Sequence, residues 1–210
     1  NWQYLNTGRP KGKLNEYTLV ENMTAKEREY KIYLPLYDVV KDIEIGIDSS
    51  SFIIVPDRNL EKPIIFYGTS ITQGGCASRP GMAHTNIINR KLDRDILNFG
   101  FSGNGRMEEP IAKLISEFDA KIYVIECMPN MNFPESITKR TIPLIDTIRE
   151  KNPNTTIILV DLFKPTFSVL NNIVFALVDA FCLIFQLCGS DGNVSEFAMR
   201  CMGMKWNKTS

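Results

Sequence analysis

The sequence predicts an α/β fold: a three-layer α/β/α sandwich with a parallel sheet, preceded by a partial β-rich segment. Short apolar runs recur along the chain after Glu61, and patterns typical of amphipathic helices lie between them. The first three runs each lead into a loop of glycine and small polar residues. Because ligands of such folds bind at the carboxyl ends of parallel strands, we expect a functional site at that edge of the sheet.

The apolar runs have the length and composition of buried strands. They are Ile64–Tyr67, Ile96–Phe99, Lys121–Cys127 and Thr156–Leu162. Two stripes of apolar residues recur at helical spacing and predict one buried face on each of two helices. The first consists of Ile111, Leu114, Ile115 and Phe118, and the second of Ile137, Leu144, Ile145 and Ile148. Pro110 and Pro134 fall near the expected helix starts, where a missing N–H costs little.

The amino-terminal residues follow a different pattern, because alternating or β-branched apolar residues favour short strands there. The predicted strands are Glu16–Glu21, Tyr30–Leu34, Asp42–Ile47 and Ser51–Val55. We therefore divide the chain into residues 1–60, the end of an N-terminal β-sandwich, and 61–165, the α/β core. Residues 166–210 form a divergent apolar C-terminal segment.

The overall composition excludes some functions. Lys and Arg together number 24, as do Asp and Glu, so the net charge is zero and nothing favours a nucleic-acid partner. None of the five cysteines forms a C-x-x-C pair, and we interpret them mainly as buried thiols. We expect no metal and no organic cofactor.

Ile173–Cys188 is almost entirely apolar and leaves two interpretations open. One is a membrane span, and the other is a buried helix or sequence foreign to the fold. Asp179 would be costly in the middle of a bilayer, so we favour the second interpretation and expect no membrane partner.

The loops after the first three predicted strands carry the groups that an ester hydrolase needs. Ser70 lies at a sharp strand-to-helix turn that Gly68 permits. The backbone N–H groups of Ser70 and Gly103 and the side-chain amide of Asn130 could bind a tetrahedral oxyanion. Each such donor contributes about 2.7–4 kcal/mol in the transition state. A phosphate-binding loop or a dinucleotide fingerprint fits the same glycines less well, because their spacing and following residues differ.

Three segments carry a resemblance to the SGNH/GDSL hydrolase family, in particular to a bacterial subgroup of carbohydrate-linked acyl esterases. They are PIIFYGTSITQGGCASRPGMAHTN (63–86), ILNFGFSGNGRMEEPI (96–111) and YVIECMPNM (123–131), and the likeness covers about residues 1–162. It implies that Ser70 is the nucleophile and that Gly103 and Asn130 hold the oxyanion. It also implies an acyl, notably acetyl, esterase acting on a small-molecule or glycan ester, in a secreted or periplasmic location. Thr69 departs from the commonest motif, which has Asp there.

The fourth element of that family, an Asp-x-x-His near the carboxyl terminus, is missing. His84 is the only histidine, and we expect it on the helix after Ser70, directed away from the strand ends. Asp191 begins a similar stretch, but no histidine follows it. An orienting Asp and a histidine base activate the serine in such enzymes, so we expect impaired activity.

The motif is lost and the composition changes at the same place, near Lys164. Our hypothesis is a replaced carboxyl terminus, for example through a frameshift, and the absence of Asp-x-x-His from the adjacent reading frames would contradict it. The alternative function is that of a non-catalytic glycan-binding pseudoenzyme, or a truncated or frameshifted product.

Overall fold

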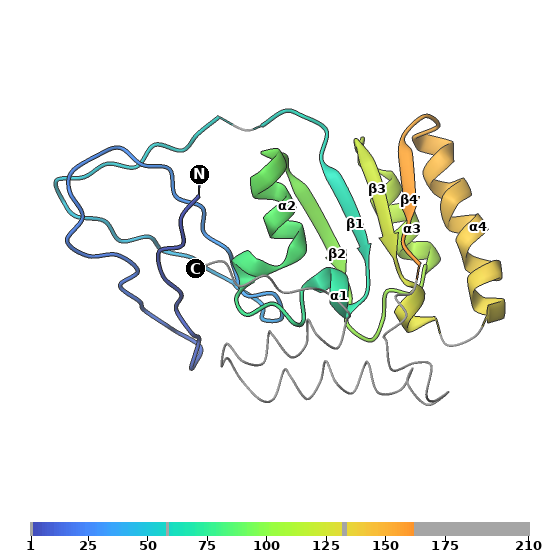
Figure 1. Ribbon diagram of the computed structural model, residues 1–210, viewed down its shortest axis with the longest axis horizontal. Coiled ribbons are helices and arrows are strands. Elements are labelled where there is room, and N and C mark those ends of the chain that lie inside the picture. Colours follow the sequence, from blue (N-terminus) through green and yellow to red (C-terminus); the bar gives the residue numbers. More distant parts are fainter. Residues whose placement is uncertain (1, 58, 132–133, 162–210) are drawn as a thin grey trace, which may run out of the picture. The chain divides into compact units, whose positions relative to one another are not determined.

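The structure is a computed structural model that describes residues 2–57, 59–131 and 134–161 (Figure 1). The chain divides into two compact units, Asn1–Leu34 and Pro35–Ser210. The α/β fold lies in the second unit and is described here by itself.

Four parallel strands form one sheet in the order β2-β1-β3-β4. Their bounds are β1 Ile64–Gly68, β2 Ile96–Gly100, β3 Ile122–Glu126 and β4 Thr156–Leu159. Every residue of β1 is buried, as expected for a strand with neighbours on both sides and helices on both faces. The four apolar runs are thus confirmed as strands, although the last is shorter than predicted.

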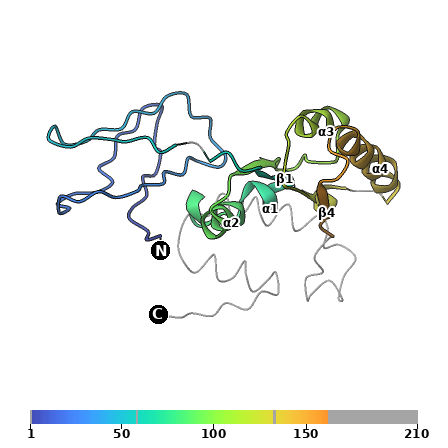
Figure 2. The same ribbon diagram turned by 90° about the horizontal axis from the view of Figure 1, so that it is seen from above.

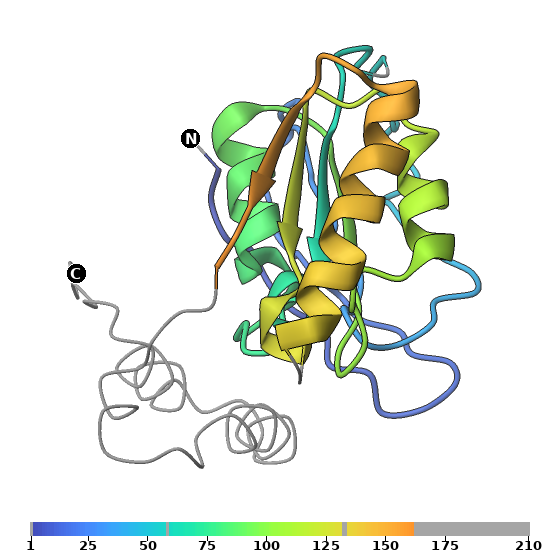
Figure 3. The same cartoon turned by 90° about the vertical axis from the view of Figure 1, so that its right-hand side faces the viewer.

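Helices cover both faces of the sheet, as Figures 2 and 3 show. The short helix α1 (Ser70–Gln73) and α2 (His84–Leu92) lie on one face. The helices α3 (Glu109–Ser116) and α4 (Pro134–Lys151) pack together on the other. Two 3-10 turns, η1 (Pro80–Met82) and η2 (Met128–Asn130), lie in the connections. The predicted three-layer arrangement is confirmed.

The hydrophobic core lies between the sheet and the α3–α4 layer. Ile65 and Tyr67 of β1 pair in register with Tyr123 and Ile125 of β3, and all four side chains are fully or almost fully buried. Helix residues from both predicted stripes pack against them, namely Ile115, Leu144 and Ile148, and Ala112 of α3 joins this cluster. Phe118 packs at the margin of this core but lies beyond the end of α3. The first predicted apolar stripe is therefore longer than the helix.

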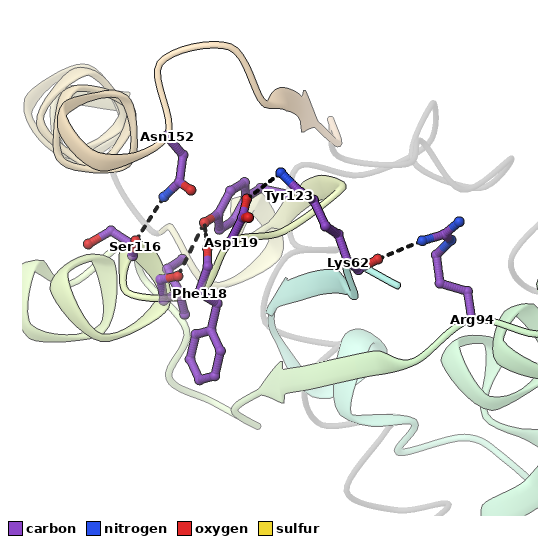
Figure 4. A network of polar contacts seen from close by, with 8 residues as sticks. Lys62, Arg94, Ser116, Phe118, Asp119, Tyr123 and Asn152 are labelled. Atoms are coloured by element: carbon purple, nitrogen blue, oxygen red, sulfur yellow. Dashed lines mark hydrogen bonds and ion pairs between the residues drawn. The ribbon is translucent and has the colours of Figure 1, made fainter. Parts of the chain in front are cut away.

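Polar contacts join the segments at the amino-terminal edge of the sheet (Figure 4). Lys62 Nζ lies 2.7 Å from Asp119 Oδ1, and Arg94 Nη1 donates to the carbonyl of Lys62 at 2.8 Å. Asn152, which is 8% exposed, donates to the carbonyl of Ser116 at 2.8 Å. These contacts fix the starts of the strands and leave the opposite edge free for a site.

The described residues between 2 and 57 contain no strand, so the four short strands predicted there are not seen in this part of the structure. A strand requires a partner that pairs with its backbone groups, and a local pattern of apolar residues cannot supply one. The boundaries 1–60, 61–165 and 166–210 remain predictions.

In the described ranges, no helix is both long and apolar enough to cross a membrane. Ile173–Cys188 and Asp191 lie outside those ranges.

Candidate active site

Three strands end level at the carboxyl edge of the sheet. Gly68, the last residue of β1, pairs in register with Gly100 of β2 and with Glu126 of β3. The arrowheads of these strands point the same way in Figure 1, toward α1. The loops that carry Ser70, Gly103 and Asn130 therefore start side by side, as the sequence predicts.

Ser70 is the first residue of α1 and is 5% exposed. The hydroxyl of Thr69 caps this turn by accepting the Ile71 N–H at 3.2 Å. Gly74 ends the turn in the left-handed conformation, with φ at +96°, which glycine adopts without strain. Because α1 comprises a single turn, individual N–H groups rather than a helix dipole must supply any electrostatic stabilisation at Ser70.

The loop after β2 holds Gly103 in a left-handed conformation, with φ at +68°, and a Cβ there would meet no atom within 4 Å. Within residues 2–57, 59–131 and 134–161, neither the Gly103 N–H nor the Ser70 N–H donates to a protein acceptor. These are the two backbone donors to which the sequence assigns an oxyanion role, and that role remains a prediction.

Hydrogen bonds tie the Gly103 loop to its neighbours. The Phe101 N–H donates to the Gly68 carbonyl at 2.9 Å, and the Ser102 N–H donates to Gln73 Oε1 at 2.8 Å. Farther along the loop, the Tyr67 hydroxyl and the Arg106 N–H both donate to the Glu108 carboxylate. Burial acts to raise the pKa of Glu108, but these hydrogen bonds outweigh it and lower that pKa. The loop is thus anchored at both ends.

Asn130 joins η2 to the same loop. It is 2% exposed, and its Nδ2 donates to the carbonyls of Asn104 and, at 3.5 Å, of Phe101. Its Oδ1 is buried without a partner in the described part of the chain. The side chain therefore lies beside Gly103, and the long bond to Phe101 leaves one amide hydrogen only weakly held.

Sequence reasoning missed Glu126, whose carboxylate lies beneath the nucleophile loop. It accepts hydrogen bonds from Thr69 and Thr72. Burial raises the pKa of Glu126, and these hydrogen bonds oppose the rise. A charged residue at the end of an apolar strand is the signal that could have revealed it.

His84 begins α2, which follows the Ser70 turn after a loop that contains η1, because α1 already ends at Gln73. Its ring packs edge-on against Phe66, with 5.7 Å between centroids, in the middle of β1. Packing around the imidazole lowers its pKa. No hydrogen bond joins these two described residues, His84 and Ser70, so the structure gives Ser70 no histidine base.

Cys127 follows Glu126 but does not offer an alternative nucleophile. It is fully buried, and burial raises the pKa of its thiol to about 12. Cys76 is half-buried, and the remaining cysteines lie outside the described residues. The part of the chain that the structure describes contains no group of His, Cys, Asp and Glu suited to a metal ion.

The sheet is parallel, and a turn that carries a serine follows one of its inner strands. A glycine-containing loop and an asparagine flank this turn. This arrangement is typical of α/β proteins whose serine lies at the carboxyl end of a strand. The GDSL-like lipase/acylhydrolase family model matches residues 61–180, and the model for the N-terminus of SGNH-hydrolase-type esterases matches residues 1–53. The chain belongs to the GDSL-like lipase/acylhydrolase family. The match continues past residue 162, where we expected the likeness to end.

Solved structures agree with the family. A protein from Bacteroides ovatus described as a putative GDSL-like lipase is 33% identical, with a TM-score of 0.62, over 80% of this chain and 48% of its own. This chain thus spans about half the length of that protein. No curated protein matches the chain.

Two further solved structures show weaker likenesses. The salicylyl-acyltransferase SsfX3 of a tetracycline biosynthetic pathway is 21% identical, with a TM-score of 0.48, over 69% of this chain and 40% of its own. A family two carbohydrate esterase from Clostridium thermocellum is 17% identical, with a TM-score of 0.43, over 60% and 51%. Both are too distant to bear on function.

Proposed function

We propose that this protein is a serine ester hydrolase of the SGNH type that acts on acyl esters of carbohydrates. Its hydrolysis rate would be low, because no histidine base contacts Ser70. Family membership supports the reaction class. The observation that supports the proposal is that, among the described residues, the N–H groups of Ser70 and Gly103 donate to no protein acceptor. The resemblance to carbohydrate-linked esterases suggests the substrate class and a secreted or periplasmic location.

In this reaction the Ser70 Oγ attacks the ester carbonyl carbon, and the new oxyanion accepts hydrogen bonds from Ser70 N–H, Gly103 N–H and Asn130 Nδ2. The hydroxyl proton passes to water, since no histidine contacts Ser70. The intermediate collapses and expels the alkoxide, which takes a proton from water and leaves as the alcohol. A second water then hydrolyses the acyl-serine, which releases the acid and restores the Ser70 hydroxyl. Loss of a triad member lowers such rates on the order of 10⁴–10⁶-fold, while the oxyanion site and binding keep a residual rate.

The experiment is hydrolysis of p-nitrophenyl acetate by the wild type and by Ser70→Ala. We expect slow turnover above the uncatalysed rate that Ser70→Ala abolishes. Ser51→Ala, the same substitution at an exposed position, is the control and should retain the wild-type rate. Turnover that is indifferent to Ser70→Ala would exclude the enzyme.

A second candidate is a non-catalytic protein that binds glycan esters. The position of His84 favours it, because this sole histidine packs on Phe66 and makes no hydrogen bond to Ser70. It predicts that an acetylated oligosaccharide binds without release of acetate, which calorimetry and acetate detection together would reveal.

A further inference from the structure

Glu126 ends β3 and places one carboxylate oxygen under the turn that carries Ser70. Glu126 Oε2 accepts the Thr69 N–H at 3.2 Å, the Thr69 hydroxyl at 2.9 Å and the Thr72 hydroxyl at 2.8 Å. Thr69 is 1% exposed and Thr72 is fully buried. Because water cannot readily replace a buried acceptor, loss of this carboxylate would leave the hydroxyls of Thr69 and Thr72 without the acceptor that they share, while the Thr69 N–H would keep its second bond, to the Glu126 carbonyl at 3.2 Å.

The carboxylate also decides which way the Thr69 hydroxyl points. Since that hydroxyl donates its hydrogen to Glu126, its lone pairs are free to accept the Ile71 N–H, at 3.2 Å. The hydrogen bonds thus run from Ile71 through Thr69 to Glu126. Ser70 lies between the two residues that this chain of bonds fixes, so its backbone direction depends on the carboxylate.

The space around Glu126 is filled on the side of the sheet edge. A Cβ at Gly68 would collide with the Thr72 hydroxyl and would lie 2.6 Å from the Glu126 carbonyl oxygen and 2.8 Å from its Oε2. The carboxylate therefore packs directly against the end of β1.

We propose that Glu126 is a positioning residue that sets the conformation of the Ser70 turn through Thr69 and Thr72 without touching substrate. It provides from β3 the carboxylate that the commonest family motif carries at the position of Thr69. The proposal rests on the proposed function in one respect, that Ser70 is the residue being positioned for attack.

The first test is the steady-state hydrolysis of p-nitrophenyl acetate by Glu126→Gln. The neutral amide can accept fewer hydrogen bonds and introduces a donor that faces the Thr69 N–H. We expect kcat to fall about 10- to 100-fold, because small displacements of an attacking group have effects of that size, while KM stays unchanged. Glu150→Gln, an exposed carboxylate on α4, is the matched control and should behave as wild type. An unchanged kcat in Glu126→Gln would overturn the proposal.

The second test does not depend on activity. It compares thermal unfolding of Thr69→Asp, of Glu126→Thr and of the double variant. Each single change should lower Tm by roughly 5–10 °C, the first by placing two carboxylates together and the second by removing the acceptor. The double variant should recover most of this loss, since the carboxylate introduced by Thr69→Asp would then serve as both acceptor and cap.

Additive losses in the double variant would overturn the proposal, whether or not Glu126→Gln folds. If the wild type shows no Ser70-dependent turnover, the proposed function fails, and the unfolding cycle still decides the role of Glu126. Recovery of Tm together with recovery of Ser70-dependent turnover is the result expected if both proposals hold.

Discussion

At the residue scale, Gly103 and Gly105 share a left-handed backbone but have different surroundings. Their φ angles are +68° and +55°. A Cβ at Gly103 would enter open space, whereas a Cβ at Gly105 would collide with the carbonyl oxygen of Gly68. The open space at Gly103 is consistent with the proposed oxyanion role, whereas the lack of a side chain at Gly105 lets the loop pack against β1.

This difference predicts unequal costs for the same substitution. Gly103→Ala should lower the free energy of unfolding by about 1–2 kcal/mol, the cost of a side chain in the left-handed region. Gly105→Ala adds a backbone collision and should cost clearly more. Urea unfolding of both variants measures the difference. Equal losses would mean that the loop relaxes away from Gly68 without penalty.

The local structure around Ser70 could be predicted from the sequence. The GTSITQG stretch indicates a serine at a tight turn, and the structure places Ser70 at the start of α1. What the stretch does not contain is the carboxylate from Glu126, which is separated from Thr69 by 57 positions.

At the element scale, the α3–α4 layer is held by the apolar stripes. Leu144 on α4 is 1% exposed and belongs to the core, whereas Leu114 on α3 is 48% exposed. Both occupy positions of the predicted stripes. When an apolar stripe is wider than the area in which a helix contacts the core, the residues at the border of the stripe stay exposed. The sequence pattern therefore cannot distinguish the two leucines, and only the packing does.

Leu144→Ala should therefore lower the free energy of unfolding by about 2–5 kcal/mol, because it opens a cavity in the core. Leu114→Ala removes the same atoms from a half-exposed site and should cost less than about 1 kcal/mol. The measurement is equilibrium urea unfolding of both variants. Similar costs would show that Leu114 is buried in solution, against the packing described here.

At the scale of the whole molecule, the proposed site would hold donors and a nucleophile, but no histidine contacts Ser70. The sole histidine of the sequence, His84, packs on the body of β1. Because the proton of Ser70 then has no histidine to accept it, a small external base should restore part of the missing function.

We predict that imidazole added to the assay increases the turnover of p-nitrophenyl acetate more for the wild type than for Ser70→Ala. Imidazole itself hydrolyses this ester, so the readout is the difference between the two proteins at each imidazole concentration. His84→Gln serves as the control and should respond like the wild type. A difference that stays constant as imidazole rises would show that proton removal does not limit the reaction.

The order of residues is enough to predict the parallel strands, the two amphipathic helices and the convergence of three loops carrying Ser70, Gly103 and Asn130. These features depend on local periodicity and on the geometry of parallel sheets, which the order of residues encodes directly. Three features become visible only in the folded chain: Thr69 donates to Glu126, His84 packs on Phe66, and described residues between 2 and 57 form no strands. Each of these depends on which residues distant in sequence become neighbours, and no local pattern carries that information.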